Sequence, residues 1–360
     1  MYLVHGLTRS YFTRKMTGYL DYTDRPWRLA PMGPEPAGHP AAAAAGWTGA
    51  IPVVDTPSGQ PMWDSTSMIE HLDQAPDLPA GRGVLPDDPT LRFLAYLLDD
   101  VSDEWFYRPA VGSRWCYDAN TVTAGWQIAE ELAVQVPVPG PMVRQMVVAT
   151  MTGSLGRIGI QADQIVVWMS EVVVPWFRAL DAHLRDDAGG GYLFGERPSI
   201  ADFAVFGANA GHFVGDPYCR ELADEHGPAV VAHTNRLRLP QEQTFGSWLE
   251  PGDIPPTLVA VVAEAGRHYL PWVAEATVEG SAVVELADGV SARIESSRFL
   301  EWARGVLLAR YVDLRSDALD AVLEEAGVLR YFVDHLDQAT AVPDVTDPPQ
   351  PSDNRPYATR

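Results

Sequence analysis

The stretch GAIPVVDTPSGQPMWDSTSMIEHLD, residues 49–73, places groups that can hold a ligand at a turn and at the start of a helix. Pro52 stands in the most strand-like run, where proline cannot donate to a β ladder, and the Ile51-Pro52 bond is of the kind that can be cis. Ser65 comes just before the apolar spacing of a helix and is placed to cap it. A hydroxyl and an amide at a helix N-terminus favour a negatively charged group.

These features allow two interpretations. If the Ile51-Pro52 bond is cis, we expect the N–H and C=O of Val53 to point away from the local ladder. They could then pair with a peptide laid antiparallel to them, which is strand addition on a small scale. Alternatively, Pro52 only shapes the fold and Ser65 only caps the helix.

Composition excludes several classes of protein. The chain has 360 residues, enough for two domains and a sizeable core. Its formal net charge of −22 argues against sequence-independent binding of DNA or RNA, which needs lysine and arginine to neutralise phosphates. The sequence has no signal peptide pattern and no run of 18 apolar residues, so we expect a cytoplasmic protein that does not span a membrane.

Other reactive side chains form no recognised motif. The nine histidines are scattered without an H-E-x-x-H pattern, so we expect no metal site. Cys116 and Cys219 lie far apart without C-x-x-C, which argues against a disulfide framework or a thiolate zinc site. The glycines of DDAGGGYLFG lack the G-x-G-x-x-G spacing and indicate a loop.

The first part of the chain predicts a small mixed sheet flanked by helices. A strand is expected over residues 1–7, a helix over 10–20, and a connection rich in Pro, Gly and Ala over 30–50 that could hold a short irregular helix. The hairpin and helix of 49–73 follow, in the order β-α-x-β-β-α. Residues 74–89 are typical of a linker.

The second part is predicted to be all-α, because apolar residues recur there at spacings of three and four. The expected helices cover residues 91–107, 119–134, 142–155, 161–184 and 199–212. Ser199 and Asp202 stand in the S-x-x-D relation of a capping box, just before an apolar run. We interpret this pair as a helix start whose role is folding.

Beyond residue 240 the pattern changes again. Residues 253–276 predict one helix, or a pair broken at Pro271. Residues 282–295 alternate around Asp288-Gly289, a strong hairpin signal, and helices are expected over 299–311 and 318–336. This extension is expected to pack on the α domain and to cover either the cleft or a partner surface.

Together these motifs resemble the glutathione transferase superfamily, over roughly residues 1–235. AIPVVD is similar to its cis-proline strand, DSTSMIEHLD to its Glu/Gln-Ser segment, and LFGERPSIADF to its capped buried helix. The resemblance implies an α/β thioredoxin-like N-terminal domain, an all-α C-terminal domain, and here a helical extension with a β-hairpin. The corresponding boundaries are 1–75, 88–238, 239–340 and a mobile, proline-rich tail at 341–360.

The resemblance implies glutathione as co-substrate, held by Ser10, Tyr11, Pro52, Val53, Asp64 and Ser65. In the serine and cysteine branches the residue that opens the first helix activates the thiol, and the frame SYFTRK places Ser10 there. Tyr11 stands where the family has proline and could itself be the donor, as could Thr13, or Ser10 is only an N-cap. Asp64 would take the α-ammonium of the γ-glutamyl group, although it is shorter than the Glu or Gln of most members.

Four side chains are expected to line a substrate pocket: Trp105, Arg108, Arg114 and Trp115. The alternative is that such tryptophans belong to the core. The leading function is transfer of the glutathione thiolate to a small electrophile. We also expect a role in detoxification, and a homodimer is one assembly that the resemblance allows. The alternatives are a binding or structural protein that has lost activation, and a glutathione-dependent reductase or lyase.

Overall fold

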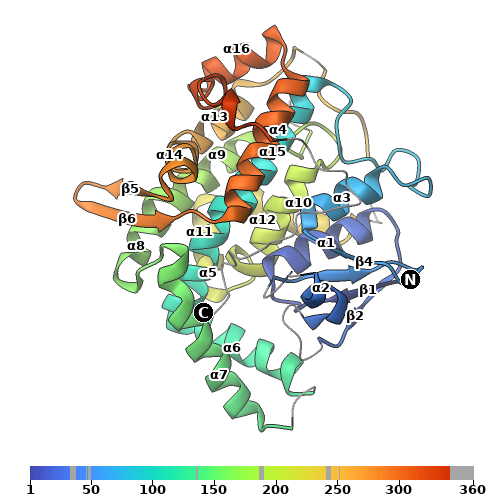
Figure 1. Cartoon of the computed structure of the whole chain (residues 1–360), viewed down its shortest axis with the longest axis vertical. Coiled ribbons are helices and arrows are strands. Elements are labelled where there is room, and N and C mark those ends of the chain that lie inside the picture. The colour runs from blue at the N-terminus through green and yellow to red at the C-terminus, as the bar shows by residue number, and fades with distance from the viewer. Residues whose placement is uncertain are drawn as a thin grey trace.

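The computed structural model describes residues 1–32, 38–45, 47, 50–134, 137–185, 190–240, 245–250 and 252–340. The tail expected at 341–360 lies outside these residues, as does part of the 30–50 connection. Figure 1 shows the small sheet and its helices at the lower right of the view, with a larger helical body beside them.

The N-terminal region is a four-stranded mixed sheet with the order β2-β1-β3-β4. Its elements, in chain order, are β1 (Tyr2–His5), α1 (Tyr11–Tyr22), β2 (Trp27–Ala30), α2 (Pro40–Ala44), β3 (Val53–Asp55), β4 (Pro61–Trp63) and α3 (Ser65–Asp73). β1 pairs parallel with β2 and antiparallel with β3, and β3 pairs antiparallel with β4. The predicted thioredoxin-like class is confirmed, with β2 as a strand that the sequence pattern did not reveal.

Alternation along the strands gives the sheet two different faces. Val4 and Val54 belong to the main core, together with buried side chains of α1 and α3. Val53 points the other way and packs with Ala42 and Trp47, on the side that α2 covers. His5 of β1, which pairs with Val53, therefore lies on the α2 face. Asp55, two residues after Val53 on β3, lies on the same face.

The second region is helical, as predicted. It contains α4 (Pro89–Asp100), η2 (Val101–Phe106), α5 (Tyr107–Cys116), α6 (Asp118–Ala133), α7 (Gly140–Ser154), η3 (Leu155–Ile158), η4 (Ala162–Gln164), α8 (Ile165–Val167), η5 (Trp168–Val173), α9 (Val174–Arg185), α10 (Ile200–Ala208), η7 (Asn209–Phe213), α11 (Pro217–His226) and α12 (Pro228–Arg238). The helix expected to end at residue 107 instead runs on through a π-helical turn into α5.

Two of the π-helical turns stand just before prolines in a continuing helix. η2 is followed by Pro109 in α5, and η5 is followed by Pro175 in α9. Proline has no N–H, so the carbonyl four residues earlier loses its usual donor. A local π-helical turn rearranges the ladder without ending the helix.

The capping box predicted at Ser199 and Asp202 is present at the start of α10. The Asp202 carboxylate accepts from the Ser199 amide at 2.8 Å, and the Ser199 hydroxyl oxygen accepts from the Asp202 amide at 3.4 Å. Both side chains are fully buried. The pair therefore satisfies helix-end groups that water cannot reach.

The extension consists of α13 (Pro256–Ala265), α14 (Tyr269–Glu279), the hairpin β5 (Ser281–Ala287) and β6 (Val290–Glu295), α15 (Arg298–Leu314), α16 (Asp317–Glu325), α17 (Arg330–Val333) and η9 (Leu336–Gln338). The expected break at Pro271 is wrong, because the helix pair separates at 266–268. Pro271 lies in the first turn of α14, where a missing N–H costs no helical bond.

The extension packs on the body of the molecule. α15 contacts α4, and the hairpin contacts α14 and η5 (Figure 1). A single contiguous cluster of buried side chains runs from the N-terminal sheet through the helical region into α14, α15 and α16. The boundaries 1–75, 88–238 and 239–340 remain a prediction, since the core does not divide at them.

Candidate functional site

A cavity of about 1000 Å³ lies where the N-terminal region, the helical region and the extension meet. Its walls are the segment 50–52, the starts of α1 and α3, and parts of α4, η2, α5, α7 and α15. Two helix N-termini and a turn before a strand therefore open into one space. Helix N-termini bring unpaired amides and positive partial charge.

The turn before β3 supplies the first part of the site. The Ile51-Pro52 peptide bond is cis, and Ile51 and Pro52 line the cavity. Val53 does not fit the expectation of free backbone groups. It pairs with His5 on β1 and with Trp63 on β4, so a strand lies on either side of it, and its side chain is fully buried on the α2 face.

Ser10 is the N-cap of α1 and lines the cavity. Its hydroxyl oxygen accepts from the Thr13 amide at 3.4 Å. The Tyr11 hydroxyl instead donates to the Ser102 carbonyl at 2.6 Å, and burial, reinforced by Asp103, raises the pKa of Tyr11 well above its usual value. Thr13 is buried beneath Gly6 and is not part of the cavity wall.

The start of α3 differs from the sequence-based expectation. The cap is Asp64, whose carboxylate accepts from the Ser67 amide at 2.9 Å, and Ser65 is the first helical residue. Asp64 has φ 67° and ψ 110°, a backbone conformation that non-glycine residues rarely adopt and that recurs at functional sites. Both residues line the cavity, and burial raises the pKa of Asp64.

A buried ion cluster, which sequence reasoning missed, lies beside the two helix starts. The Lys15 ammonium stands 2.6 Å from an Asp99 oxygen and 2.5 Å from an Asp103 oxygen, and it also donates to Thr66 at 2.9 Å. Burial opposes the charge on Lys15, yet Asp103 and Asp99 raise its pKa. Burial raises the pKa of Asp103 to about 8, with Lys15 opposing the shift and Asp99 adding to it.

Two further carboxyl groups, Asp100 and Glu104, extend this acidic wall. Burial raises the pKa of Asp100 to about 6, against the hydrogen bond donated by the Tyr269 hydroxyl. Burial also raises the pKa of Glu104 well above its usual value. Burial therefore disfavours the charged forms of these carboxyl groups, which limits the net negative charge of the wall. The run DDVSDE in one long helix was the only sequence signal for this wall.

Three of the four residues predicted for a substrate pocket line the cavity: Arg108, Arg114 and Trp115. Trp105 does not, because it lies within η2 and packs against Trp168 and Trp272 in the core. The Arg114 guanidinium donates to Asp216 at 2.8 Å and to the Arg9 carbonyl at 2.7 Å. This arginine is thus fixed by protein groups.

Arg108 is fixed in the same way. It donates to the Ile158 carbonyl at 2.9 Å and its guanidinium carbon lies 4.5 Å from the centre of the Trp272 ring. The cavity also has an apolar surface. It is formed by Val143, Met146 and Val147 of α7 together with Phe299, Trp302 and Val306 of α15. The extension therefore forms part of the cavity wall, and its expected role in covering the cleft or a partner surface stays a prediction.

The protein's own thiols are poor nucleophiles. Cys116 and Cys219 are free, and burial raises the pKa of both, that of Cys219 to about 12. A thiol of raised pKa in an apolar environment is inert at neutral pH. Thiolate chemistry in this cavity would need a thiol from outside the chain.

Comparison with known families gives one match within the chain. Residues 4–80 match the model of the glutathione S-transferase N-terminal domain, which spans the sheet, α1 and α3. None of the curated proteins matches the chain. Among the described residues, no helix combines the length and apolar character that crossing a membrane requires.

Comparison with solved structures gives further matches, including the following three. One from Rhodopseudomonas palustris, a possible glutathione S-transferase, has 18% identity and a TM-score of 0.38, covering 68% of this chain and 96% of its own. A glutathione S-transferase from Methylobacillus flagellatus KT with glutathione bound has 16% identity and a TM-score of 0.35, covering 65% and 93%. The β-etherase LigF from Sphingobium sp. strain SYK-6 has 16% identity and a TM-score of 0.44, covering 66% and 94%. Such likeness does not establish a shared activity.

Proposed function

Because residues 4–80 match the model of the glutathione S-transferase N-terminal domain, we propose that the chain binds glutathione in the cavity and conjugates its thiolate to an apolar electrophile. The observation that carries this proposal is the convergence of three groups on one space. They are the start of α1 at Ser10, the cis-proline turn at Ile51-Pro52, and the start of α3 at Asp64 and Ser65.

Ser10 is the group best placed to hold the thiolate. Its oxygen accepts from the Thr13 amide, so the hydroxyl proton remains available for a sulfur in the cavity. Tyr11 has its single hydroxyl proton directed to the Ser102 carbonyl, and Thr13 lies behind the wall. A hydrogen bond to the charged form lowers the pKa of a thiol, which increases the fraction present as nucleophile.

The cis-proline turn would hold the peptide part of glutathione. Val53 is already paired on both sides, so we assign this role to Ile51, which lines the cavity and precedes the strand. No backbone hydrogen bond joins Ile51 to another described residue. We propose that its N–H donates to an extended peptide and that its C=O accepts from it, in the manner of strand addition.

The γ-glutamyl end has both charges matched at α3. The Ser65 hydroxyl and the first amides of the helix favour the carboxylate, because the helix dipole is positive there. One oxygen of Asp64 caps Ser67, and the carboxylate lies in the cavity wall close enough to Asp99 to interact with it. An ammonium group beside Asp64 would be stabilised by these carboxyl groups.

The apolar wall indicates the class of electrophile. α7 and α15 present valine, methionine, phenylalanine and tryptophan side chains to the cavity, and such a surface gains free energy by removing apolar area from water. In the reaction, the thiolate forms a carbon–sulfur bond and the leaving group departs with the electron pair of the broken bond. Ser10 holds the sulfur before attack, and the wall positions the electrophilic carbon.

Calorimetric titration of the full chain with glutathione, followed by conjugation assays with aromatic and alkyl electrophiles, tests the proposal. Saturable binding at one site per chain together with turnover supports it. Absence of glutathione binding to the folded protein overturns it. Binding of apolar ligands without turnover would instead favour a binding protein that has kept the fold. The cytoplasm, a homodimer and a role in detoxification remain predictions.

A further inference from the structure

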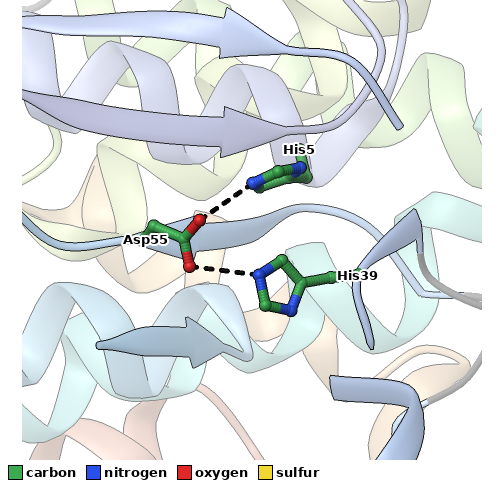
Figure 2. A group of neighbouring side chains, drawn as sticks. All are labelled: His5, His39 and Asp55. Carbon is green, nitrogen blue, oxygen red and sulfur yellow. Dashed lines mark hydrogen bonds and ion pairs between the residues drawn. The ribbon is translucent and has the colours of Figure 1, made fainter. Parts of the chain in front are cut away.

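Three side chains from separate segments meet on the α2 face of the N-terminal sheet. They are His5 at the end of β1, His39 just before α2, and Asp55 at the end of β3 (Figure 2). All three are half-buried. None of them lines the cavity described above, so any ligand that they hold is separate from the proposed glutathione site.

Strand register brings His5 and Asp55 together. His5 pairs with Val53, and Asp55 pairs with Leu3, so the two side chains are diagonal neighbours on one face of an antiparallel pair. His39 reaches the same point from the connection, where it is the residue before Pro40 of α2. The spacing along the chain gave no motif, which is why the sequence predicted no metal site.

The donor atoms face one another. The Nε2 atoms of His5 and His39 each lie 3.1 Å from a different oxygen of Asp55. The two imidazole rings are edge to face with centres 4.9 Å apart, and the potential ligand atoms all lie within 4.8 Å of one another. Figure 2 shows both rings directed at the carboxylate.

The outer contact of His5 determines what its inner nitrogen presents. Nδ1 of His5 lies 3.2 Å from the Pro31 carbonyl, which can only accept, so Nδ1 carries a proton. Nε2 is therefore the nitrogen of His5 that is placed to bind a cation beside the Asp55 carboxylate. An N–H directed to a backbone carbonyl is also the usual outer contact of a metal-bound histidine.

We propose that His5, His39 and Asp55 bind one divalent transition-metal ion of the zinc type. Two imidazoles and one carboxylate are a zinc ligand set that leaves the fourth position open, whereas calcium and magnesium prefer oxygen ligands alone. Zinc bonds of about 2.0–2.1 Å place tetrahedral ligand atoms about 3.4 Å apart. The observed separations of 3.1 Å and the 4.8 Å limit require only small side-chain movements.

Metal binding would connect the α2 segment to the sheet. His39 belongs to the segment that leads to Trp47, and Trp47 packs on Val53 and lines the cavity. The ion therefore stabilises the fold near one wall of the cavity, without contacting it. Because binding occurs in the folded state, the metal raises the free energy of unfolding.

The test uses metal-free full-length protein titrated with Zn²⁺ against a chromophoric chelator. We expect one tight Zn²⁺ site per chain. Asp55→Asn and His39→Gln should each lower its affinity by more than about 100-fold, which exceeds the loss caused by removing a residue that only hydrogen-bonds to a metal ligand. His71→Gln, in α3 and outside the cluster, is the matched control and keeps wild-type affinity. Mg²⁺ should not compete.

Two further measurements complete the test. Co²⁺ in the wild-type protein should give intense visible absorption bands of a low-symmetry site, and these bands should be lost in both variants. Melting curves without metal establish that each variant is folded, and only the wild type and His71→Gln should gain stability with Zn²⁺. Absence of a tight site in the folded wild type, or equal affinity in all variants, overturns the proposal. The cluster is then an ion pair between imidazolium and carboxylate.

Discussion

The helices α3 and α10 both begin with an acidic side chain that serves in a cap, but they begin in different surroundings. At α10, Asp202 accepts from the Ser199 amide and hydroxyl, the Leu193 amide and His233 Nε2, all within 3.0 Å, in a fully buried position. At α3, Asp64 accepts from the amide and the side chain of Ser67 and lies in the wall of the cavity.

This difference separates folding from binding. A carboxylate with four protein donors has its acceptor positions filled and cannot serve a ligand without breaking a native contact. Among the described residues, the hydrogen-bond donors to the carboxylate at α3 belong to Ser67 alone, and Asp64 lies at the cavity with an unusual backbone conformation. The same capping chemistry thus supports structure at α10 and leaves α3 able to serve a ligand.

The largest expected effect is at α10. Asp202→Ala removes the acceptor for four buried donors, including the His233 ring, and we expect the free energy of unfolding to fall by about 3–5 kcal/mol. The dissociation constant for glutathione of the folded fraction should be unchanged. Urea unfolding and calorimetry measure the two quantities.

The matched control for this change is Asp224→Ala. Asp224 forms an exposed pair with Arg220 one helical turn away, so its loss should alter the free energy of unfolding by less than about 0.5 kcal/mol. If Asp202→Ala melts normally but loses glutathione, the start of α10 belongs to the ligand site. The contrast with α3 would then be wrong.

The next effect concerns α1, whose cap also lines the cavity. Ser10→Ala removes the hydroxyl donor to the thiolate, and a hydrogen bond to a charged group is worth about 1.5–3 kcal/mol. We therefore expect the pKa of bound glutathione to rise by about 1–2 units and conjugation at neutral pH to fall about 10- to 100-fold. Ultraviolet titration of the complex measures the thiolate.

Tyr11→Phe is the control for Ser10. It removes a hydroxyl that donates to the Ser102 carbonyl, so it should lower stability and leave the pKa of bound glutathione unchanged. An unchanged thiolate pKa in Ser10→Ala, with a raised one in Tyr11→Phe, would show that the donor had been assigned to the wrong residue.

The sequence predicted a structural feature correctly where the residues that determine it lie close together along the chain. The α10 capping box was predicted correctly because Ser199 and Asp202 belong to the same first turn. At α3, Asp64 and Ser65 are adjacent and both are good caps. The choice between them depends on the positive φ of Asp64, which the turn after β4 imposes and residue types do not reveal.

Errors in the candidate site have long-range causes. The pairing of Val53 on both sides follows from strand register. Trp105 faces the core because it lies in a π-helical turn, which changes the direction of side chains relative to a regular helix. The cluster of Lys15 with Asp99 and Asp103 joins the first helix to the fourth, so no local pattern could predict it.

The cluster of Lys15, Asp99 and Asp103 offers a third test. Asp103 is buried like Asp202, but it accepts hydrogen bonds from only Lys15 and Thr66 among the described residues, whereas Asp202 has four donors. The folded pKa of Asp103 is about 8, above the value of about 3.9 for an unfolded Asp. The folded state thus retains a proton that the unfolded state releases. The resulting stabilisation is complete below about pH 4 and is lost as the pH rises through about 8.

Between these values the free energy of unfolding should fall with rising pH, by up to about 1.4 kcal/mol per pH unit from this group. Asp103→Asn removes the contribution, so its stability curve should be flatter than that of the wild type, while exposed Asp224→Asn should follow the wild type. Denaturant unfolding at a series of pH values gives the slopes. Equal slopes in Asp103→Asn and the wild type would mean that Asp103 is already ionised in the folded protein.

The smallest expected effect is at Ser65, and it tests the ligand role of α3 directly. Ser65 is the first helical residue and not the cap, and alanine is a good helix former, so Ser65→Ala should leave the unfolding free energy nearly unchanged. Loss of its hydroxyl from the γ-glutamyl carboxylate should weaken glutathione binding by about 0.5–1.5 kcal/mol. Binding of an S-alkyl glutathione should weaken by the same factor, since its alkyl group contacts the apolar wall and not Ser65.

Ser316→Ala is the control, because it removes the cap of α16, which lies outside the cavity. It should show the reverse pattern, with lower stability and unchanged binding. If calorimetry gives Ser65→Ala and the wild type the same dissociation constant for glutathione, the start of α3 serves folding alone, as the start of α10 does.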